Sequence, residues 1–183
     1  MTAPVRVLAV DDRRENLLAL QAILEGLPIE VVAVTSGEEA LKKLLVNDYA
    51  VILLDARMPG MDGFETARHV KQRERTRHIP ILFLTAADHD PHLAFRSYQA
   101  GAVDYITKPF DPWVLRSKVA VFVDLHLLHT EVAERAAERD ALRKSVDEAL
   151  RLLDAAESTD AATSALLARL RGALGAQRHD LHS

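Results

Sequence analysis

Five short, almost continuously apolar segments alternate with longer amphipathic segments over the first part of the chain. The apolar segments are residues 5–10, 30–35, 50–54, 79–84 and 103–106. They are rich in Val, Ile and Leu on both faces, which is typical of strands buried on both sides of a parallel sheet. Strands that alternate with helices form such a sheet, covered by helices on both faces. The sequence therefore predicts an α/β domain with a doubly wound, five-stranded parallel sheet.

Several helix starts can be read from capping residues. Ser36 and Glu39 have the spacing of a capping box, in which each side chain accepts a hydrogen bond from a free backbone N–H. Asp90-Pro91 and Asp111-Pro112 each place an acidic N-cap before a proline at the first helical position. We therefore expect helices to begin at these three points.

The composition changes at Pro112. All seven prolines lie at or before it, and neither Gly nor Pro occurs from Trp113 to Arg171. We expect a compact domain over residues 1–123 and a helical, coiled-coil extension over residues 124–183, with a break offered at 158–160. The extension carries one heptad register, interrupted by Arg135 and Arg139, that predicts a homodimer seam. The alternative is that this apolar stripe folds back on the chain's own first domain. Its proposed dimerisation residues are Leu125, Leu128, Val132, Leu142, Val146 and Leu153.

Composition and charge exclude several classes of protein. The chain has no cysteine, so disulfides, thiolate metal sites and thiol nucleophiles are ruled out. The formal net charge is −4 and no segment concentrates Lys or Arg, so no nucleic-acid partner is expected. No apolar run reaches the roughly 18 residues of a membrane span, and the first residues do not read as a secretion signal. We expect a cytoplasmic protein without a membrane partner.

Unusual polar residues follow four of the predicted strands. Asp11 and Asp12 follow the first strand, and Asp55 follows the third. Thr85 follows the fourth strand, and Lys108 follows the fifth. In a sheet of the common order 2-1-3-4-5, these carboxyl ends meet at one edge, where open α/β sheets bind their ligands.

Three carboxylates this close repel one another unless a cation neutralises them. Lys108 supplies one positive charge, and Mg²⁺, which prefers oxygen ligands and keeps several waters, would supply two more. A carboxylate beside such an ion, with a lysine and a hydroxyl aimed at the same point, can attack phosphorus and form an aspartyl phosphate. The sequence thus predicts a magnesium-dependent phosphoryl site.

Four motifs resemble the receiver domain of two-component response regulators, which has a flavodoxin-like fold. The resemblance covers residues 5–123. Its carriers are Val10-Asp11-Asp12 with Glu15-Asn16, residues 54–63 (LDARMPGMDG), Leu84-Thr85-Ala86 and residues 101–110 (GAVDYITKPF). All four motifs in this order are highly specific for the family.

The resemblance implies a role for each site residue. Asp55 would be the phosphoacceptor, supplied by a histidine kinase. Asp12, Asp55 and the backbone carbonyl of Arg57 would ligate Mg²⁺ (or Mn²⁺) directly, while Asp11 would act mainly through water. Thr85 and Lys108 would contact the phosphoryl group.

The family also implies a switch and a backbone feature. Thr85 would move toward the phosphoryl group and Tyr105 would turn inward with it. The Lys108–Pro109 peptide bond would be cis, which X–Pro bonds adopt at small cost.

The leading hypothesis is a response regulator in a phosphorelay that catalyses only its own phosphorylation and dephosphorylation. It would signal to a downstream protein partner through protein–protein contacts and coiled-coil dimerisation, without a DNA-binding output. One alternative is a Mg²⁺-dependent aspartyl-phosphate phosphatase. Haloacid-dehalogenase-type phosphatases place a second acid two residues after the nucleophile, however, and here Arg57 holds that position. A third possibility is a structural coiled-coil adaptor.

Overall fold

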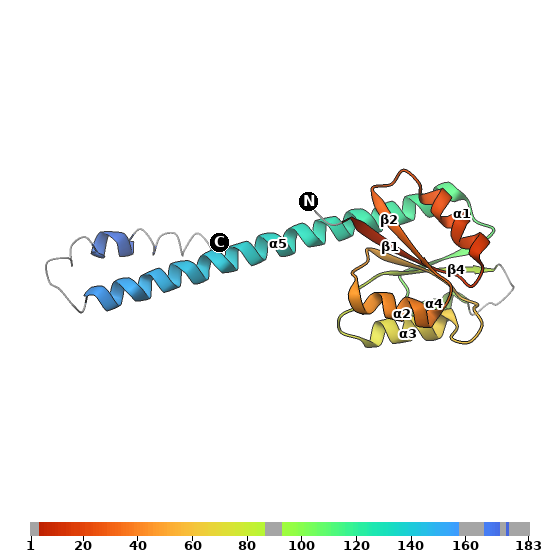
Figure 1. Cartoon of the computed structure of the whole chain (residues 1–183), viewed down its shortest axis with the longest axis horizontal. Helices are drawn as coiled ribbons and strands as arrows, with labels where there is room; N and C mark the ends of the chain where they lie inside the picture. The colour runs from red at the N-terminus through yellow and green to blue at the C-terminus, as the bar shows by residue number, and fades with distance from the viewer. Residues whose placement is uncertain (1–3, 87–92, 158–166, 173–174, 176–183) are drawn as a thin grey trace. The chain divides into compact units, whose positions relative to one another are not determined.

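The computed structural model describes residues 4–86, 93–157, 167–172 and 175. The chain divides into two compact units, residues 1–127 and 128–183. The first unit contains a five-stranded parallel sheet with the order β2-β1-β3-β4-β5 (Figure 1). The predicted fold class is therefore confirmed.

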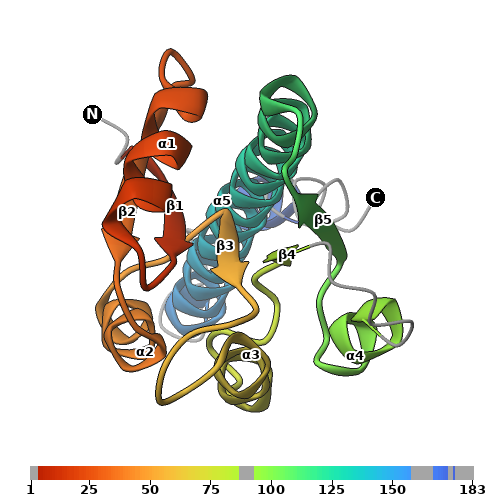
Figure 2. The ribbon, with the colours of Figure 1, turned by 90° about the vertical axis from the view of Figure 1, so that its right-hand side faces the viewer.

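Strands and helices alternate along the chain. The strands are β1 (Val5–Val10), β2 (Ile29–Val34), β3 (Val51–Asp55), β4 (Ile81–Ala86) and β5 (Asp104–Lys108). The helices are α1 (Arg14–Leu24), α2 (Gly37–Val46), α3 (Gly63–Gln72), α4 (Leu93–Gln99) and α5 (Pro112–Glu157). Helices α1 and α5 lie on one side of the sheet, and α2, α3 and α4 lie on the other (Figure 2).

Each face of the sheet has its own apolar core. Ile52 and Leu54 of β3 point into the core beneath α2 and α3. Val51 and Leu53 point into the opposite core, beneath α1 and α5. Successive side chains of a strand alternate between faces, so a strand covered on both faces must be apolar at every position. This explains the uninterrupted apolar segments in the sequence.

The strand boundaries differ from the predicted ones in an informative way. β4 begins at Ile81 rather than at residue 79, directly after Pro80, whose nitrogen cannot donate to the ladder. At their carboxyl ends, β3, β4 and β5 extend further than predicted. Asp55 pairs with Leu84 and Thr85 pairs with Thr107, so these polar residues lie inside the ladder rather than after it.

Two of the three predicted caps fall within the described residues. The Ser36 hydroxyl accepts a hydrogen bond from the backbone N–H of Glu39, and Asp111 accepts one from that of Trp113. The Glu39 carboxylate accepts from the backbone N–H of Thr35 rather than of Ser36, so the capping box is shifted by one residue. The predicted Asp90-Pro91 cap lies outside the described residues.

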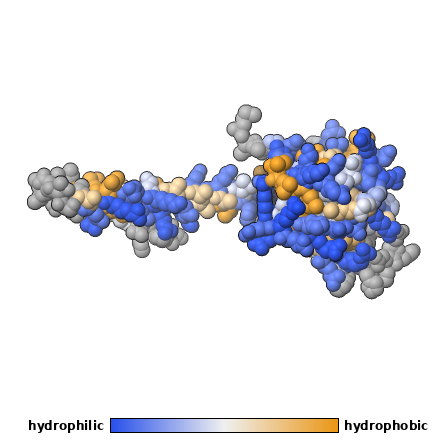
Figure 3. Space-filling view, turned by 60° about the horizontal axis from the view of Figure 1, so that its bottom comes forward, coloured by the Kyte–Doolittle hydropathy of each residue, from blue (hydrophilic) through white to orange (hydrophobic). Residues whose placement is uncertain are grey.

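Helix α5 belongs to both compact units. Its first turns carry Leu115, Val119 and Val123, which are buried in the core beneath the sheet. From residue 128 to residue 145 every residue is exposed, and the surface of the helix shows apolar side chains among many polar ones (Figure 3). Within the described part of the chain, no helix is long and apolar enough to cross a membrane. The predicted break near 158–160 lies outside the described residues.

Candidate functional site

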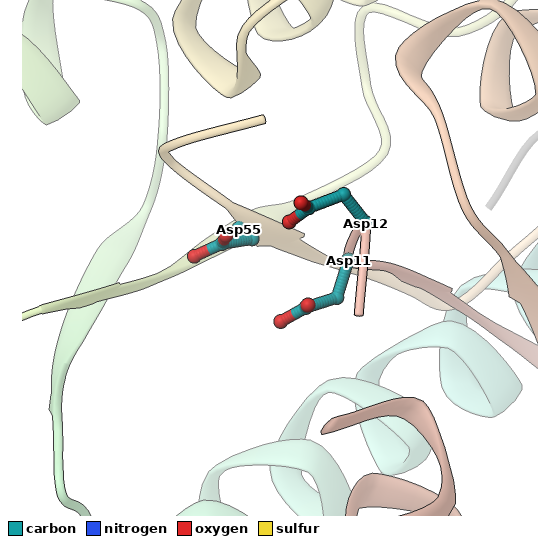
Figure 4. Close-up of side chains that lie close together, drawn as sticks. All are labelled: Asp11, Asp12 and Asp55. Atoms are coloured by element: carbon teal, nitrogen blue, oxygen red, sulfur yellow. The ribbon is translucent and has the colours of Figure 1, made fainter. Parts of the chain in front are cut away.

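Three carboxylates gather at the carboxyl ends of β1 and β3. Asp11 and Asp12 directly follow β1, and Asp55 is the last residue of β3. Each contributes an oxygen to a cluster whose atoms all lie within 4.8 Å of one another (Figure 4). Asp11 and Asp55 are buried, whereas Asp12 is exposed. The cluster therefore has two carboxylates fixed in the protein interior and one at its mouth.

Asp11 is held by four hydrogen bonds. Its Oδ1 accepts from Asn16 Nδ2 at 2.8 Å and from the backbone N–H of Arg13 at 3.0 Å. Its Oδ2 accepts from Asn16 Nδ2 at 3.0 Å and from Lys108 Nζ at 2.8 Å. Because both Asp11 oxygens already accept hydrogen bonds from protein donors, Asp11 is suited to hold Lys108 and Asn16 in place rather than to bind a ligand directly.

Lys108, the last residue of β5, joins the two buried carboxylates. Its Nζ donates to Asp11 at 2.8 Å and to Asp55 at 3.1 Å, across 97 and 53 positions of sequence. Burial alone would lower the pKa of Lys108. The hydrogen bond to Asp11, together with the charges of Asp55 and Asp11, outweighs burial and raises it. Lys108 is therefore a permanent cation at neutral pH.

The pKa of Asp55 is raised above its usual value, chiefly because burial disfavours the charged carboxylate. Lys108 opposes this rise, and the neighbouring charges of Asp11 and Asp12 add to it. A single ammonium thus leaves the three carboxylates under-neutralised. An all-oxygen donor set with excess negative charge fits Mg²⁺, which typically binds one or two carboxylates and retains waters.

The remaining predicted site residues surround this cluster. Thr85 is buried, and its hydroxyl makes a long contact of 3.5 Å with the carbonyl of Ala86. Tyr105 is half-buried on β5, with its ring 6.3 Å from the ring of Tyr98 on α4 in an edge-on arrangement. The Lys108–Pro109 peptide bond is cis.

Arg57 lies beside the cluster, two residues beyond Asp55. It lines a cavity of about 460 Å³ together with Phe64, Thr85 and Arg96. The Arg96 guanidinium lies 4.4 Å from the centre of the Phe64 ring, as in a cation–π contact. This cavity, next to the end of β3, is therefore walled by two arginines and an aromatic ring.

Gly63 lies against the backbone of Asp55, a contact that the sequence pattern did not predict. A Cβ atom at this first residue of α3 would lie 2.1 Å from the backbone oxygen of Asp55 and 2.9 Å from the Cα of Ala56. Only glycine lets α3 start this close to the end of β3. Gly63 directly follows Asp62, which caps α3 by accepting from the backbone N–H of Glu65 at 2.7 Å.

Comparison with known proteins identifies the first unit. Residues 7–120 match the family model described as the response regulator receiver domain. The chain is 37% identical to the sensor histidine kinase GacS of Pseudomonas protegens, over 94% of this chain and 19% of GacS. It is 36% identical to the response regulator PleD of Caulobacter vibrioides, over 72% of this chain and 29% of PleD. This chain thus spans well under half of either relative.

Solved structures show the same fold. A response regulator from Chloroflexus aurantiacus superposes with a TM-score of 0.62 at 35% identity, covering 67% of this chain and 99% of that one. The receiver domain of the sensor histidine kinase PA1611 from Pseudomonas aeruginosa has a TM-score of 0.60 at 30% identity, with the same coverage of both chains. That structure holds a magnesium ion in its active-site cleft. The chain described here belongs to the receiver-domain family of two-component response regulators.

Proposed function

We propose that this chain accepts a phosphoryl group on Asp55 from a histidine kinase and passes the signal to a protein partner. The observation that carries the proposal is the joining of the Asp11–Asp12–Asp55 cluster to Lys108 at 2.8 and 3.1 Å. Asp12, Asp55 and the backbone carbonyl of Arg57 would hold Mg²⁺ or Mn²⁺. When bound, this ion supplies positive charge that offsets the carboxylates and the transferring phosphoryl oxygens.

The transfer requires a charged, accessible nucleophile. An oxygen of the Asp55 carboxylate forms a bond to phosphorus while the phosphorus–nitrogen bond to the kinase histidine breaks, and the imidazole keeps the electron pair. Lys108 favours the ionised form of Asp55 against the burial that disfavours it. Catalysis would consist of positioning and charge stabilisation, with Lys108 and Thr85 contacting the phosphoryl oxygens.

The proposed conformational switch involves the Thr85 hydroxyl and the Tyr105 ring. Among the described residues, the Thr85 hydroxyl has only the long 3.5 Å contact, so it would gain a stronger hydrogen bond by turning toward a phosphoryl oxygen. That movement opens space into which Tyr105 can turn, away from Tyr98. The surface formed by α4, β5 and α5 would change accordingly, and a partner that binds one form better would shift the population.

The output is proposed to run through protein contacts and through dimerisation along α5, without a DNA-binding domain in this chain. A helical stretch with no tertiary contacts is marginal in water. Leu128 and Val132 are 58% and 65% exposed, on the same heptad register. Packing against a second copy would bury them and stabilise the helix, as in a coiled coil.

The test is the intact mass of the chain after incubation with Mg²⁺ and a small phosphodonor. Asp55→Asn is the test variant, and Asp62→Asn is the matched control, since Asp62 caps α3 outside the cluster. A single acid-stable, base-labile phosphoryl adduct on the wild type and on Asp62→Asn, absent from Asp55→Asn, supports the proposal. An adduct that persists in Asp55→Asn, or no adduct with any donor or kinase, contradicts it. Unchanged assembly on phosphorylation would favour the structural adaptor instead.

A further inference from the structure

Among the described residues, two ring contacts join α4 to its neighbours. On the β5 side, the Tyr98 ring meets the Tyr105 ring edge-on at 6.3 Å. On the α3 side, the Arg96 guanidinium lies 4.4 Å from the centre of the Phe64 ring. Tyr98 and Arg96 are both exposed. Contacts of this kind at a protein surface are weak, so a small change of free energy is enough to break them.

The Arg96–Phe64 contact bridges a groove between α3 and α4. One cavity of about 460 Å³ extends from this contact toward Thr85, and another of about 410 Å³ extends toward Arg68 and Gln99. Phe64 and Arg96 line both cavities. Because open volume flanks the contact, α4 is fixed less tightly against α3 than close packing would fix it.

The same contact is connected to the phosphoryl site through β4. The Phe64 ring lies 4.8 Å from the ring of Phe83, which is buried on β4. Phe83 and Thr85 are two positions apart on this strand, so their side chains point to the same face of the sheet. Phe83 also pairs with Tyr105 in the β4–β5 register. Arg96, Phe64 and Phe83 thus form a continuous stack from α4 to the strand that carries Thr85.

We propose that the Arg96–Phe64 contact is a latch that holds α4 in its resting position, and that the conformational switch releases it. The inference rests on the switch of the proposed function, in which Tyr105 turns away from Tyr98. That turn removes the contact on the β5 side and leaves the latch to hold α4. An exposed cation–π contact changes an equilibrium by about two- to fivefold. A latch of this strength favours the resting position of α4 and still lets phosphorylation shift the population.

A buried thiol on α4 reports how often the helix opens. The chain has no cysteine, and Ser97 on α4 is buried. Ser97→Cys replaces a hydroxyl by a thiol, whose rate of reaction with an aromatic disulfide reagent follows the population of the open form. In this background, Arg96→Gln removes the cation and keeps a polar side chain. Arg68→Gln is the matched control, because Arg68 lines the second of the two cavities.

The latch predicts different reaction rates for these variants. Without a phosphodonor, the thiol of Arg96→Gln should react about two- to fivefold faster than that of the background protein, and Arg68→Gln should match the background. Mg²⁺ with a small phosphodonor should raise the rate of the background protein and reduce its difference from Arg96→Gln, because the latch is then already released. Equal resting rates in Arg96→Gln and Arg68→Gln overturn the latch. A difference that phosphorylation leaves unchanged overturns its release by the switch.

A double-mutant cycle tests whether Arg96 acts through the ring. Phe64→Leu keeps an apolar side chain without the ring, so adding Arg96→Gln to it should give no further acceleration. A full acceleration in that background assigns the effect to another contact of Arg96 and overturns the latch.

The latch and the function on which it rests can fail separately. Phosphoryl acceptance is measured on each variant by intact mass, and every variant should carry the adduct. If no adduct forms on Asp55 in any variant, the proposed function and the release of the latch both fail. The resting rates need no phosphoryl group, so they still decide whether the Arg96–Phe64 contact holds α4.

Discussion

Replacing Lys108 by methionine should destabilise the protein far more than a typical lysine substitution does. Lys108 Nζ is the shared donor for Asp11 and Asp55, whose side chains are only 1% and 11% exposed. Methionine keeps the length of the side chain but leaves both carboxylates without this cation. Removing one partner from a buried ion pair costs about 3–5 kcal/mol, because the remaining charge stays buried without compensation. In a chain of this size, that corresponds to a fall in Tm on the order of 10 °C.

Lys118→Met is the matched control. Lys118 also pairs with an aspartate, Asp104, but the two side chains are 39% and 30% exposed. Ion pairs of this kind contribute about 0–1 kcal/mol, because solvent screens them. Both variants are to be unfolded in urea and by heat without divalent cations, at one fixed protein concentration, because self-association would otherwise shift the apparent stability.

Magnesium adds a second measurement to the same pair of variants. The site of Lys108→Met carries one positive charge fewer, so a divalent cation that neutralises the same carboxylates should raise its Tm more than it raises the Tm of the wild type or of Lys118→Met. The reasoning is refuted if Lys108→Met loses no more stability than Lys118→Met without Mg²⁺. It is equally refuted if Mg²⁺ stabilises all three proteins alike.

Three further substitutions test other parts of the site and the core. Gly63→Ala should cost about 1–3 kcal/mol in unfolding free energy and slow phosphorylation of Asp55, because the new Cβ would lie 2.1 Å from the Asp55 backbone oxygen. Gly172→Ala, whose Cβ would meet nothing within 4 Å, is the comparison without crowding. Asn16→Ala should weaken Mg²⁺ binding about 10-fold in a thermal-shift titration, because Asp11 loses its side-chain amide donor. Tyr49→Phe should leave stability at pH 7 unchanged or slightly higher, because the buried Tyr49 hydroxyl has no hydrogen-bond partner among the described residues. Burial raises the pKa of Tyr49 above 10.0, so the unfolded chain releases the phenolic proton at a lower pH than the folded chain does. The wild type should therefore lose stability as the pH rises above about 10. Unfolding curves of Tyr49→Phe should lack that contribution.

The meeting of the site residues could be predicted from sequence because it depends only on topology. In a doubly wound parallel sheet all strands point the same way, so their carboxyl ends share one edge. The convergence of Asp11, Asp55 and Lys108 could be predicted from one fact alone, that each follows an apolar segment. The structure brings them within hydrogen-bonding distance across 97 and 53 positions of sequence.

The strand ends could not be predicted from the apolar pattern. That pattern reports which residues avoid water, and it stops at the first polar side chain. Asp55 and Thr85 are polar, yet they are 8% and 1% exposed and still belong to the ladder. The prediction therefore ended these strands too early at the point where the functional side chains begin.

The sequence pattern also could not predict how closely α3 approaches the end of β3, or what covers the apolar register of α5. Nothing in residues 54–63 states that a Cβ at Gly63 would overlap the backbone of Asp55, because that contact depends on the angle at which α3 leaves the sheet. A heptad register likewise states that Val146 will be covered, without stating by what. The register is satisfied equally well by a second copy or by the chain's own residues.

Asp11 and Asp55 are held by different numbers of hydrogen bonds. This difference suggests how Lys108 could serve the site both before and after the proposed phosphorylation of Asp55. Lys108 is bound to Asp11, which is fixed by Asn16 and by the backbone of Arg13, and to Asp55, which is free to react. If an Asp55 oxygen is bonded to phosphorus as proposed, the carboxyl group loses its own charge and its attraction for the ammonium weakens. The phosphoryl oxygens would then carry the negative charge, and Asp11 would keep Lys108 beside them. In this proposal Asp11 acts by positioning the cation, which predicts that Asp11→Asn impairs the retention of Lys108 at the phosphoryl group more than it impairs the nucleophile.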